Sequence, residues 1–432
     1  MFAASTATKI FRCPGEQYDI SRSVHLARLA AFYSKCRNCP QAPSADGSAA
    51  VPDPNCETPV LPPRHASLFA PEGVRGRYLN ELNRATAAEI AGAMASCLWE
   101  RGGPSVVVAH DERPSSPDIV TGVGQALRRM GCQVVDIGLA TRPCLMFAID
   151  HLKAAGGILV TGAGCDPGWS GLDFVSEGVP CSMPGELDHI AERFRQGYSR
   201  PSRRPGSQRT FQASIPYAAG LCKHFHALRP LKIALACPSH AVQDVFSRAF
   251  RQLACRLIPV ETPTRQRAMG DPTDPDLVRV SRMICETQAD LGVLIADDGE
   301  QCTCLDEQGR IVAPRLMAKV LIEVASLDFR AESVALYPAA WQPGQTAPVK
   351  IRAMSDDARQ HQPPLFIGDP NRENMTRAMQ RQQAVFGADE AGRFWFAESF
   401  PTCDALLTVV HLLQALSRSD SPLSRIIQDV GG

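Results

Sequence analysis

The feature that most constrains the fold of this chain is a regular alternation of short apolar runs with amphipathic helical patterns. Runs such as SVVVAH (105–110) and GGILVTG (156–162) have the length and β-branched content of buried strands, and the segments between them have helical spacing. The same succession returns at about residue 231 and again at about residue 314. This alternation is typical of helices layered on a parallel or mixed sheet, so the sequence predicts three similar α/β units in tandem.

Length and breaks in the pattern predict the boundaries. A chain of 432 residues, 44% of them hydrophobic, exceeds one core and has ample apolar material for several. A Pro-, Ser- and Ala-rich stretch without periodicity (41–63) indicates a linker, and an Arg-, Pro- and Ser-rich stretch (195–209) indicates a second break. We predict a small N-terminal Cys-containing module with its linker, followed by three α/β domains with mixed sheets, at 1–64, 65–205, 206–312 and 313–432.

Charge and cysteine usage restrict the partners and the compartment. Lys plus Arg and Asp plus Glu are 45 each, so no net field favours nucleic acid or an anionic membrane, and neither is predicted as a partner. The first residues contain no signal-peptide core, and no run approaches the roughly 20 apolar residues of a membrane span. The 16 cysteines are scattered through a large chain, which favours reduced thiols or metal ligands over disulfides. A cytoplasmic protein is predicted.

The N-terminal module contains a candidate metal site. Cys13 precedes a CxxC pair, Cys36 and Cys39, and a predicted helix lies between them. CxxC commonly binds zinc, and the chain before the helix is long enough for the three thiols to converge. We predict that Zn²⁺ is bound there, with Cys56 or His65 as the fourth ligand. Buried thiols without metal, or an iron–sulfur cluster, are the alternatives.

Several motifs, in order along the chain, resemble one known family. They are FAPEGVRG (69–76), HDERPSSP (110–117) and DIGLATRPCLMFAIDHLKAAGGILVTG (136–162). From about residue 68 onward the chain is similar to the α-D-phosphohexomutases (phosphoglucomutase/phosphomannomutase). The resemblance implies three similar α/β domains with this family's fold. The family's fourth domain carries a phosphate clamp, and we expect it to be absent, because SPLSRIIQDVGG (421–432) directly follows the third domain.

The resemblance also implies where the catalytic serine would lie. In the family, a serine in a Thr-Ala-Ser-His-Asn-Pro loop carries the phosphoryl group. Aligned without a gap, TGAGCDPGWSG (161–171) has Ala163 at the serine position and Gly164 at the histidine position. Neither side chain can carry phosphate. Cys165 and Asp166 follow as substitute nucleophiles, but their displacement is too large for in-line phosphoryl transfer.

The metal loop implied by the resemblance is also altered. The family binds Mg²⁺ with a strand end of sequence Asp-Gly-Asp-x-Asp-Arg, whose alternate carboxylates converge on the ion. Here Ala296, Asp298 and Glu300 occupy the ligand positions, and Gln301 replaces the arginine. We predict weak Mg²⁺ binding by Asp298 and Glu300 at most, with a solvated acidic turn as the simpler interpretation.

Substrate recognition by the family uses a Gly-Glu-x-Ser-Gly-His loop. FGADEAGRFWF (386–396) matches its frame, and a sugar-binding remnant of Asp389, Glu390 and Arg393 is predicted there. Ala391 replaces the serine, and Pro370 stands where the family's phosphate-binding lysine belongs.

These losses predict a phosphohexomutase-like protein of carbohydrate metabolism that is catalytically inactive and acts as a sugar-binding, scaffold or regulatory protein. Its predicted partners are a sugar or sugar phosphate, or another protein. The alternative is an enzyme, either an active phosphohexomutase or one with new chemistry around Cys165, Asp298, Glu300 and Asp389. The fold alone does not decide between these classes.

Overall fold

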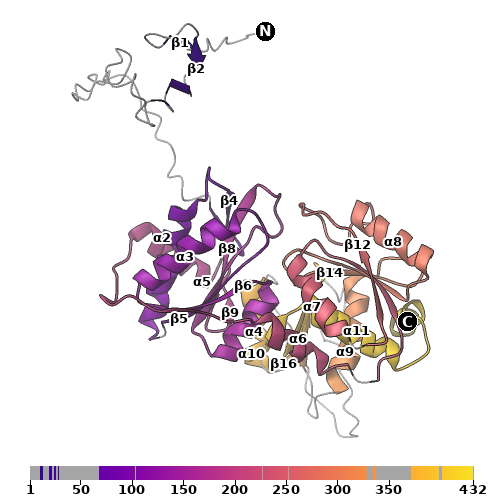
Figure 1. Ribbon diagram of the computed structural model, residues 1–432. Helices are drawn as coiled ribbons and strands as arrows, with labels where there is room; N and C mark the ends of the chain where they lie inside the picture. Colours follow the sequence, from indigo (N-terminus) through magenta and orange to yellow (C-terminus); the bar gives the residue numbers. More distant parts are fainter. Residues whose placement is uncertain are drawn as a thin grey trace, which may run out of the picture. The chain divides into compact units, whose positions relative to one another are not determined.

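The computed structural model (Figure 1) describes residues 10–12, 19–21, 24, 25, 28, 68–102, 104–225, 227–251, 253–327, 334–336, 371–397 and 401–431. The chain separates into two compact units, Met1–Pro62 and Pro63–Gly432. In the first, β1 (Ile10–Phe11) pairs antiparallel with β2 (Ile20–Ser21).

The predicted zinc ligands Cys13, Cys36 and Cys39, with Cys56 and His65, lie outside the described residues, as does Pro370. The zinc site therefore stays a prediction.

The second unit begins with an eight-stranded mixed sheet in the order β10-β6-β5-β7-β8-β4-β3, with β9 beside β8. Its strands are β3 (Phe69–Ala70), β4 (Gly73–Arg77), β5 (Ser105–His110), β6 (Gln133–Leu139), β7 (Gly156–Val160), β8 (Trp169–Ser176), β9 (Val179–Pro180) and β10 (Gln208–Thr210). The strands from β10 to β7 are parallel, and β8, β4 and β3 are antiparallel to their neighbours. Because β10 pairs with β6, the first sheet takes a strand from beyond the boundary predicted at residue 205.

Both faces of this sheet are covered by helices. On one face lie α2 (Arg84–Glu100), α3 (Ser116–Arg129) and α5 (Glu186–Gln196), and on the other lies α4 (Arg142–Leu152). Along β5, Val106 and Val108 pack toward the first group, whereas Val107 and Ala109 pack toward α4. Burial on both faces explains why this strand is a continuous apolar run rather than an alternating one.

The second sheet repeats the strand order of the first. Its strands are β11 (Lys232–Ala236), β12 (Arg256–Val260), β13 (Leu291–Ile295) and β14 (Cys302–Leu305). The order β12-β11-β13-β14, with only β14 antiparallel, corresponds to β6-β5-β7-β8. Its faces are covered by α7 (His240–Phe250) and α8 (Pro275–Thr287), and α6 (Ser214–Cys222) precedes it.

The third sheet has the order β15-β16-β17-β18. Its strands are β15 (Val334–Leu336), β16 (Ala384–Ala388), β17 (Phe394–Ala397) and β18 (Pro401–Cys403). Its helices are α9 (Pro314–Leu327), α10 (Arg372–Gln382), α11 (Ala405–Ser417) and α12 (Leu423–Gly431). One apolar cluster includes α4, α7, α9 and α11 and joins the three sheets into a single body. The predicted α/β class with mixed sheets is confirmed.

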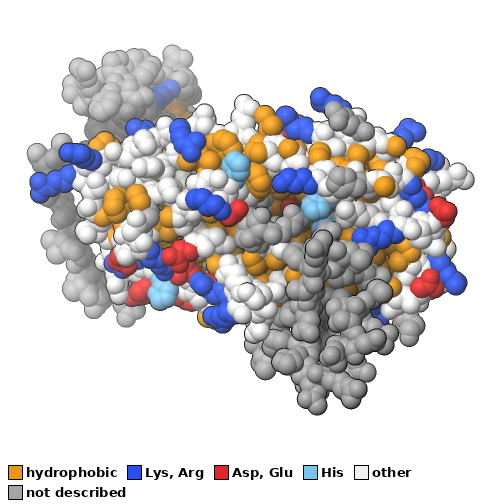
Figure 2. All heavy atoms as spheres, turned by 90° about the horizontal axis from the view of Figure 1, so that it is seen from below, with side chains coloured by type: hydrophobic (Ala, Val, Ile, Leu, Met, Phe, Trp, Pro, Cys, Tyr) orange, Lys and Arg blue, Asp and Glu red, His pale blue; other side chains and the backbone are white. Residues whose placement is uncertain are grey.

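The surface agrees with the balanced composition of the chain. On the face in Figure 2, basic and acidic side chains are scattered among apolar and uncharged ones. Within the described ranges, every helix is too short or too polar to cross a bilayer.

Candidate functional site

Three equivalent connections meet in the second unit. Each connection leads from the last parallel strand of a sheet to the antiparallel strand beside it. The connected strands are β7 and β8, β13 and β14, and β16 and β17. The Gly164 amide donates to Asp297 Oδ1 at 3.2 Å, and an isolated β-bridge joins Gln301 to Arg393. The topology therefore brings the loops of Ala163, Asp298 and Asp389 together although more than 90 residues separate consecutive members in sequence.

The first connection is a loop whose backbone amides are hydrogen-bonded to neighbouring side chains. The Gly162 amide donates to Asp111 Oδ2 at 3.0 Å, and the Ala163 amide donates to Thr161 Oγ1 at 3.0 Å. Gly164 has a φ of +78°, a left-handed conformation that favours glycine. The partly buried Ala163 contributes only a methyl group to this ordered loop.

Arg113 fixes the remainder of the same loop. This buried guanidinium donates to the carbonyls of Cys165 at 2.8 Å, Asp166 at 2.7 Å and Trp169 at 3.2 Å. It also pairs with Asp297 at 3.1 Å. Burial and then the charge of Asp298 raise the pKa of Asp297, and Arg113 opposes both. The loop is therefore anchored through main-chain atoms, and the Asp166 side chain lies exposed.

The second connection is a tight turn over residues 296–301. Asp298 Oδ1 accepts from the amides of Glu300 at 2.8 Å and Gln301 at 3.3 Å. Gly299 has a φ of +76°, and the Ala296 amide donates to the Gln301 carbonyl at 2.9 Å. One oxygen of Asp298 is thus used to form the turn, and Oδ2 remains for other partners.

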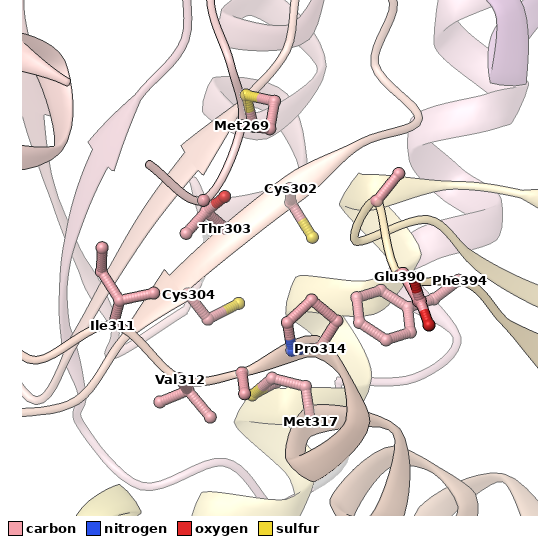
Figure 3. Close-up of a pocket in the computed structure, with 13 residues that line it drawn as sticks. Met269, Cys302, Thr303, Cys304, Ile311, Val312, Pro314, Met317, Glu390 and Phe394 are labelled. Carbon is pink, nitrogen blue, oxygen red and sulfur yellow. The ribbon is translucent and has the colours of Figure 1, made fainter. Parts of the chain in front are cut away.

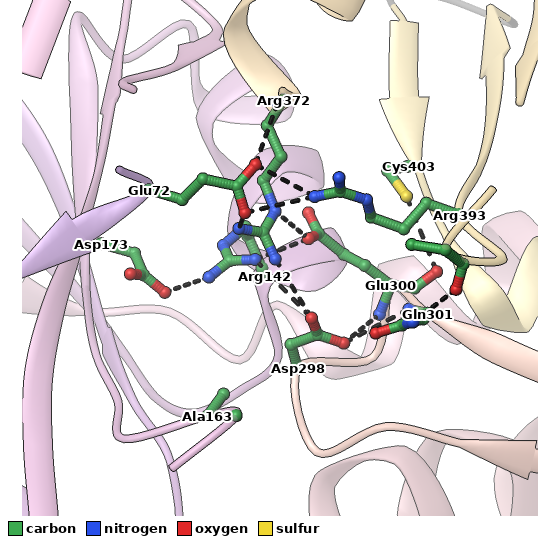
Figure 4. Close-up of polar contacts among 12 residues, drawn as sticks. Glu72, Arg142, Ala163, Asp173, Asp298, Glu300, Gln301, Arg372, Arg393 and Cys403 are labelled. Carbon is green, nitrogen blue, oxygen red and sulfur yellow. Dashed lines mark hydrogen bonds and ion pairs between the residues drawn. The ribbon is translucent and has the colours of Figure 1, made fainter. Parts of the chain in front are cut away.

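Side chains of the second and third connections join an ionic cluster, which we call the arginine–carboxylate network (Figure 4). It comprises the guanidinium groups of Arg75, Arg142, Arg372 and Arg393 and the carboxylates of Glu72, Asp173, Asp298, Glu300 and Asp389. In Figure 4 Ala163 lies on the loop next to this cluster.

Arg142, the first residue of α4, is the most deeply buried cation of the network at 2% exposure. It pairs with Asp173, with Glu300 at 2.5 Å and more distantly with Asp298 at 4.0 Å. Burial of the guanidinium and the charge of Arg372 lower its pKa, but the three carboxylates outweigh them and the net shift is upward. Arg142 therefore stays protonated.

Arg372, the first residue of α10, occupies the other side of Glu300. It donates to Glu300 Oε2 at 2.5 Å and to Asp298 Oδ2 at 3.1 Å, and it also pairs with Glu72. Arg393 reaches the same Glu72 carboxylate at 3.0 Å. Burial alone would raise the pKa of Glu72, but Arg372, Arg393 and Arg142 lower it to about 2.

Asp173 lies on β8, a strand otherwise apolar around it. It accepts from Arg75 Nη1 at 2.7 Å and pairs with Arg142. Burial would raise the pKa of Asp173, but Arg142 and then Arg75 lower it to about 2. Glu72 and Asp173 are therefore both ionised at neutral pH.

Glu373 provides a second link between α10 and the segments that surround the first sheet. Its Oε2 accepts from the amides of Ser182 at 2.8 Å and Glu186 at 3.1 Å, the latter being the first residue of α5. A carboxylate from α10 thus satisfies backbone donors at the beginning of α5. Arg372 and Glu373 together attach α10 to the segments that surround the first sheet.

The residues present do not fit the Mg²⁺ ion that the family resemblance implies. Ala296 offers no ligand, Asp298 Oδ1 is used by its own turn, and Glu300 is held between two guanidinium groups. Mg²⁺ prefers an octahedron of oxygens, which two carboxylates already paired with arginines do not supply. Over the described ranges, no three His, Cys, Asp or Glu side chains are arranged to hold a metal.

Of the three residues predicted to bind sugar, the structure brings Asp389 and Arg393 together and places Glu390 apart from them. Asp389 is buried, accepts from the Ala391 amide at 3.0 Å and pairs with Arg393 at 2.6 Å. Glu390 is exposed and lies on a different pocket, beside Phe394. Asp389 and Arg393 therefore stabilise their own turn and the network, and Glu390 takes no part in it.

Sequence reasoning missed five members of the network: Glu72, Arg75, Arg142, Asp173 and Arg372. A signal existed for Asp173, because a carboxylate inside the apolar strand WSGLDFVS requires a buried partner. For Arg142 and Arg372 the only signal was their position at the start of a helix. A cation is unfavourable there unless carboxylates compensate its charge.

Comparisons with known proteins place this geometry in a family. The model for phosphoglucomutase/phosphomannomutase α/β/α domain I matches residues 66–200, and the model for domain III matches residues 372–431. The chain belongs to the α-D-phosphohexomutase family. The residues matched by the domain I model include Ala163, and those matched by the domain III model include Arg372 and Asp389.

Relatives in the phosphohexomutase family are distant. A phosphomannomutase/phosphoglucomutase of Pseudomonas aeruginosa is 26% identical over 275 residues, covering 62% of this chain and 58% of that relative, which is less than two thirds of its length. A phosphoglucosamine mutase of Symbiobacterium thermophilum is 24% identical. That alignment covers 83% of this chain and 80% of the relative. The crystal structure of a phosphoglucomutase/phosphomannomutase family protein from Burkholderia thailandensis has the same fold, with a TM-score of 0.70 at 21% sequence identity. The superposition covers 83% of this chain and 78% of that chain.

Proposed function

We propose that this chain is a non-catalytic phosphohexomutase-like protein that acts as a binding, scaffold or regulatory protein in carbohydrate metabolism. The observation that carries the proposal is the pairing of Arg142 and Arg372 with Asp298 and Glu300 beside a loop that has Ala163 in place of a nucleophile.

The missing hydroxyl removes the covalent step of mutase chemistry. A phosphoryl carrier needs an oxygen or another nucleophile in line with the transferred group. The Cys165 and Asp166 carbonyls are bound by Arg113, so the loop has little freedom to bring either side chain to the position of Ala163. A relocated nucleophile is therefore disfavoured by the geometry as well as by the sequence spacing.

The network also removes the charge complementarity that a phosphorylated substrate requires. The guanidinium groups of Arg142, Arg372 and Arg393 are already paired with carboxylates of the same chain. An incoming phosphate would have to displace Glu72 or Asp173, whose ionised forms these same cations stabilise. A sugar phosphate, the class that the relatives' names indicate, remains a proposed ligand but without turnover.

We expect purified protein to carry no phosphoserine at this loop and not to convert glucose 1-phosphate or mannose 1-phosphate to the 6-phosphate. The assay includes Mg²⁺ and a hexose bisphosphate primer, with peptide mass spectrometry for phosphorylation and calorimetry for binding of each sugar phosphate. The P. aeruginosa relative is the positive control. Steady turnover that disappears in Cys165→Ser or Asp166→Asn would overturn the proposal in favour of a relocated nucleophile.

Restoring the hydroxyl alone should not restore activity. In Ala163→Ser, the position of Ala296 still lacks a ligand, and Asp298 and Glu300 remain paired with Arg142 and Arg372. Phosphoryl transfer depends mainly on positioning and charge stabilisation, so we expect no rate above that of Ala163→Gly, which lacks a hydroxyl. A coupled mutase assay with a parallel Mg²⁺ titration measures this. Robust activity of Ala163→Ser would mean that the ion pairs yield to metal and substrate.

A further inference from the structure

A second site adjoins the network, in a pocket of about 340 Å³ between β14 and α9. Four sulfur-containing side chains line it, namely Met269, Cys302, Cys304 and Met317. In Figure 3 the thiols of Cys302 and Cys304 point into this space, and the Met317 thioether approaches it from α9.

The two cysteines form a C-x-C pair on an extended strand. Residues i and i+2 of a strand project from the same face, about 6.7 Å apart along the backbone. Both thiols line the same pocket, so a single ion in it faces both sulfur atoms. The ladder with β13 and the bond from the Cys302 amide to the Gly392 carbonyl at 3.0 Å fix the strand that carries them.

The remaining walls of the pocket are mostly apolar. Ile311, Val312, Pro314 and Phe394 line it together with the sulfur atoms. Cys302 and Cys304 are 3% and 2% exposed, and Gly270 and Glu390 form an exposed rim. The pocket therefore offers soft donors beside apolar side chains, with an opening to solvent.

We propose that Cys302, Cys304 and Met317 form a binding site for a soft univalent metal ion, Cu⁺. Thiolate and thioether ligands select Cu(I), whereas structural zinc needs four ligands, and the hard cations Mg²⁺ and Ca²⁺ need oxygens. Binding exchanges the thiol protons for the ion: two S–H bonds break, two S–Cu bonds form, and two protons go to solvent. No change of oxidation state is involved, and the site is independent of the proposed function.

The test is an anaerobic titration of the reduced full-length protein with Cu⁺ supplied as its bathocuproine disulfonate complex. This chelator competes with single thiols, so its loss of colour counts sites with several sulfur ligands. Because Cys36 and Cys39 also form a thiol pair, the titration is repeated in Cys36→Ala/Cys39→Ala. In both backgrounds, Cys302→Ala/Cys304→Ala is expected to remove one equivalent of bound copper. X-ray absorption of copper-loaded Cys36→Ala/Cys39→Ala, in which Cys302 and Cys304 are retained, should show sulfur as the only neighbour of the ion.

Matched variants separate the site from general effects. Cys132→Ala/Cys181→Ala removes two buried thiols from elsewhere in the fold and should leave the stoichiometry unchanged. Met317→Leu keeps the apolar volume and should weaken binding about tenfold through loss of the thioether. Thermal melts of each apoprotein confirm folding. An unchanged stoichiometry and affinity in folded Cys302→Ala/Cys304→Ala would overturn the proposal, as would equal binding of Zn²⁺ at this pair.

Discussion

Replacing Glu300 with glutamine is expected to lower the free energy of unfolding by about 3–5 kcal/mol, the usual cost of removing one partner from a buried ion pair. Glu300 is 2% exposed and is shared by Arg142 and Arg372 at 2.5 Å each. Glutamine keeps the volume but removes the charge, which leaves two buried guanidinium groups undercompensated. Denaturant unfolding followed by circular dichroism measures the change.

An exposed pair provides the control for this prediction. Glu192 pairs with Arg195 at 2.5 Å on the surface of α5, where both side chains are about half exposed. Glu192→Gln removes the same charge and should change stability by less than about 1 kcal/mol. If Glu300→Gln were equally mild, the network would contribute little to stability, and its arginines would be available to an anionic ligand.

Acid should destabilise the protein through Glu72 and Asp173. The pKa of Glu72 falls from 4.5 to about 2 on folding, and that of Asp173 from 3.8 to about 2. A carboxyl with a depressed folded-state pKa binds protons more tightly when unfolded, so its contribution is present above about pH 5 and is lost toward pH 2. Each should contribute on the order of 2–3 kcal/mol. Urea unfolding at several pH values between 5 and 2 measures how steeply the free energy of unfolding falls with pH, which we call the acid slope.

Neutral variants test which groups cause the acid sensitivity. Glu72→Gln and Asp173→Asn should each be less stable than the parent at pH 7 and should lose less stability between pH 5 and 2. Glu192→Gln should retain the slope of the parent. A parent slope that persists in Glu72→Gln/Asp173→Asn would assign the acid sensitivity to other carboxylates.

The sequence predicted the fold well where periodicity decides the structure. The run SVVVAH coincides with β5, and the run GGILVTG contains β7. The predicted break before residue 206 missed β10, because three exposed residues that pair at a sheet edge leave no apolar pattern.

The candidate site was predictable only in part. The positions of Ala163 and Asp298 followed from motifs, since each follows a recognisable apolar strand. Arg142 and Arg372 are paired with Glu300 across separations of 158 and 72 residues, and no local pattern encodes such partners. The sequence therefore indicated which groups a mutase would lack, whereas only the tertiary structure revealed the cations that surround the remaining carboxylates.

The bonds of Glu373 affect how this part of the chain should respond to denaturant. The Glu186 amide at the beginning of α5 and the Ser182 amide before it have their acceptor on α10, about 190 residues away in sequence. Fraying of either helix leaves polar groups of the other without partners, so the two helices gain from being folded at the same time. We infer that the first and third sheets unfold in one cooperative transition, without an intermediate in which either stands alone.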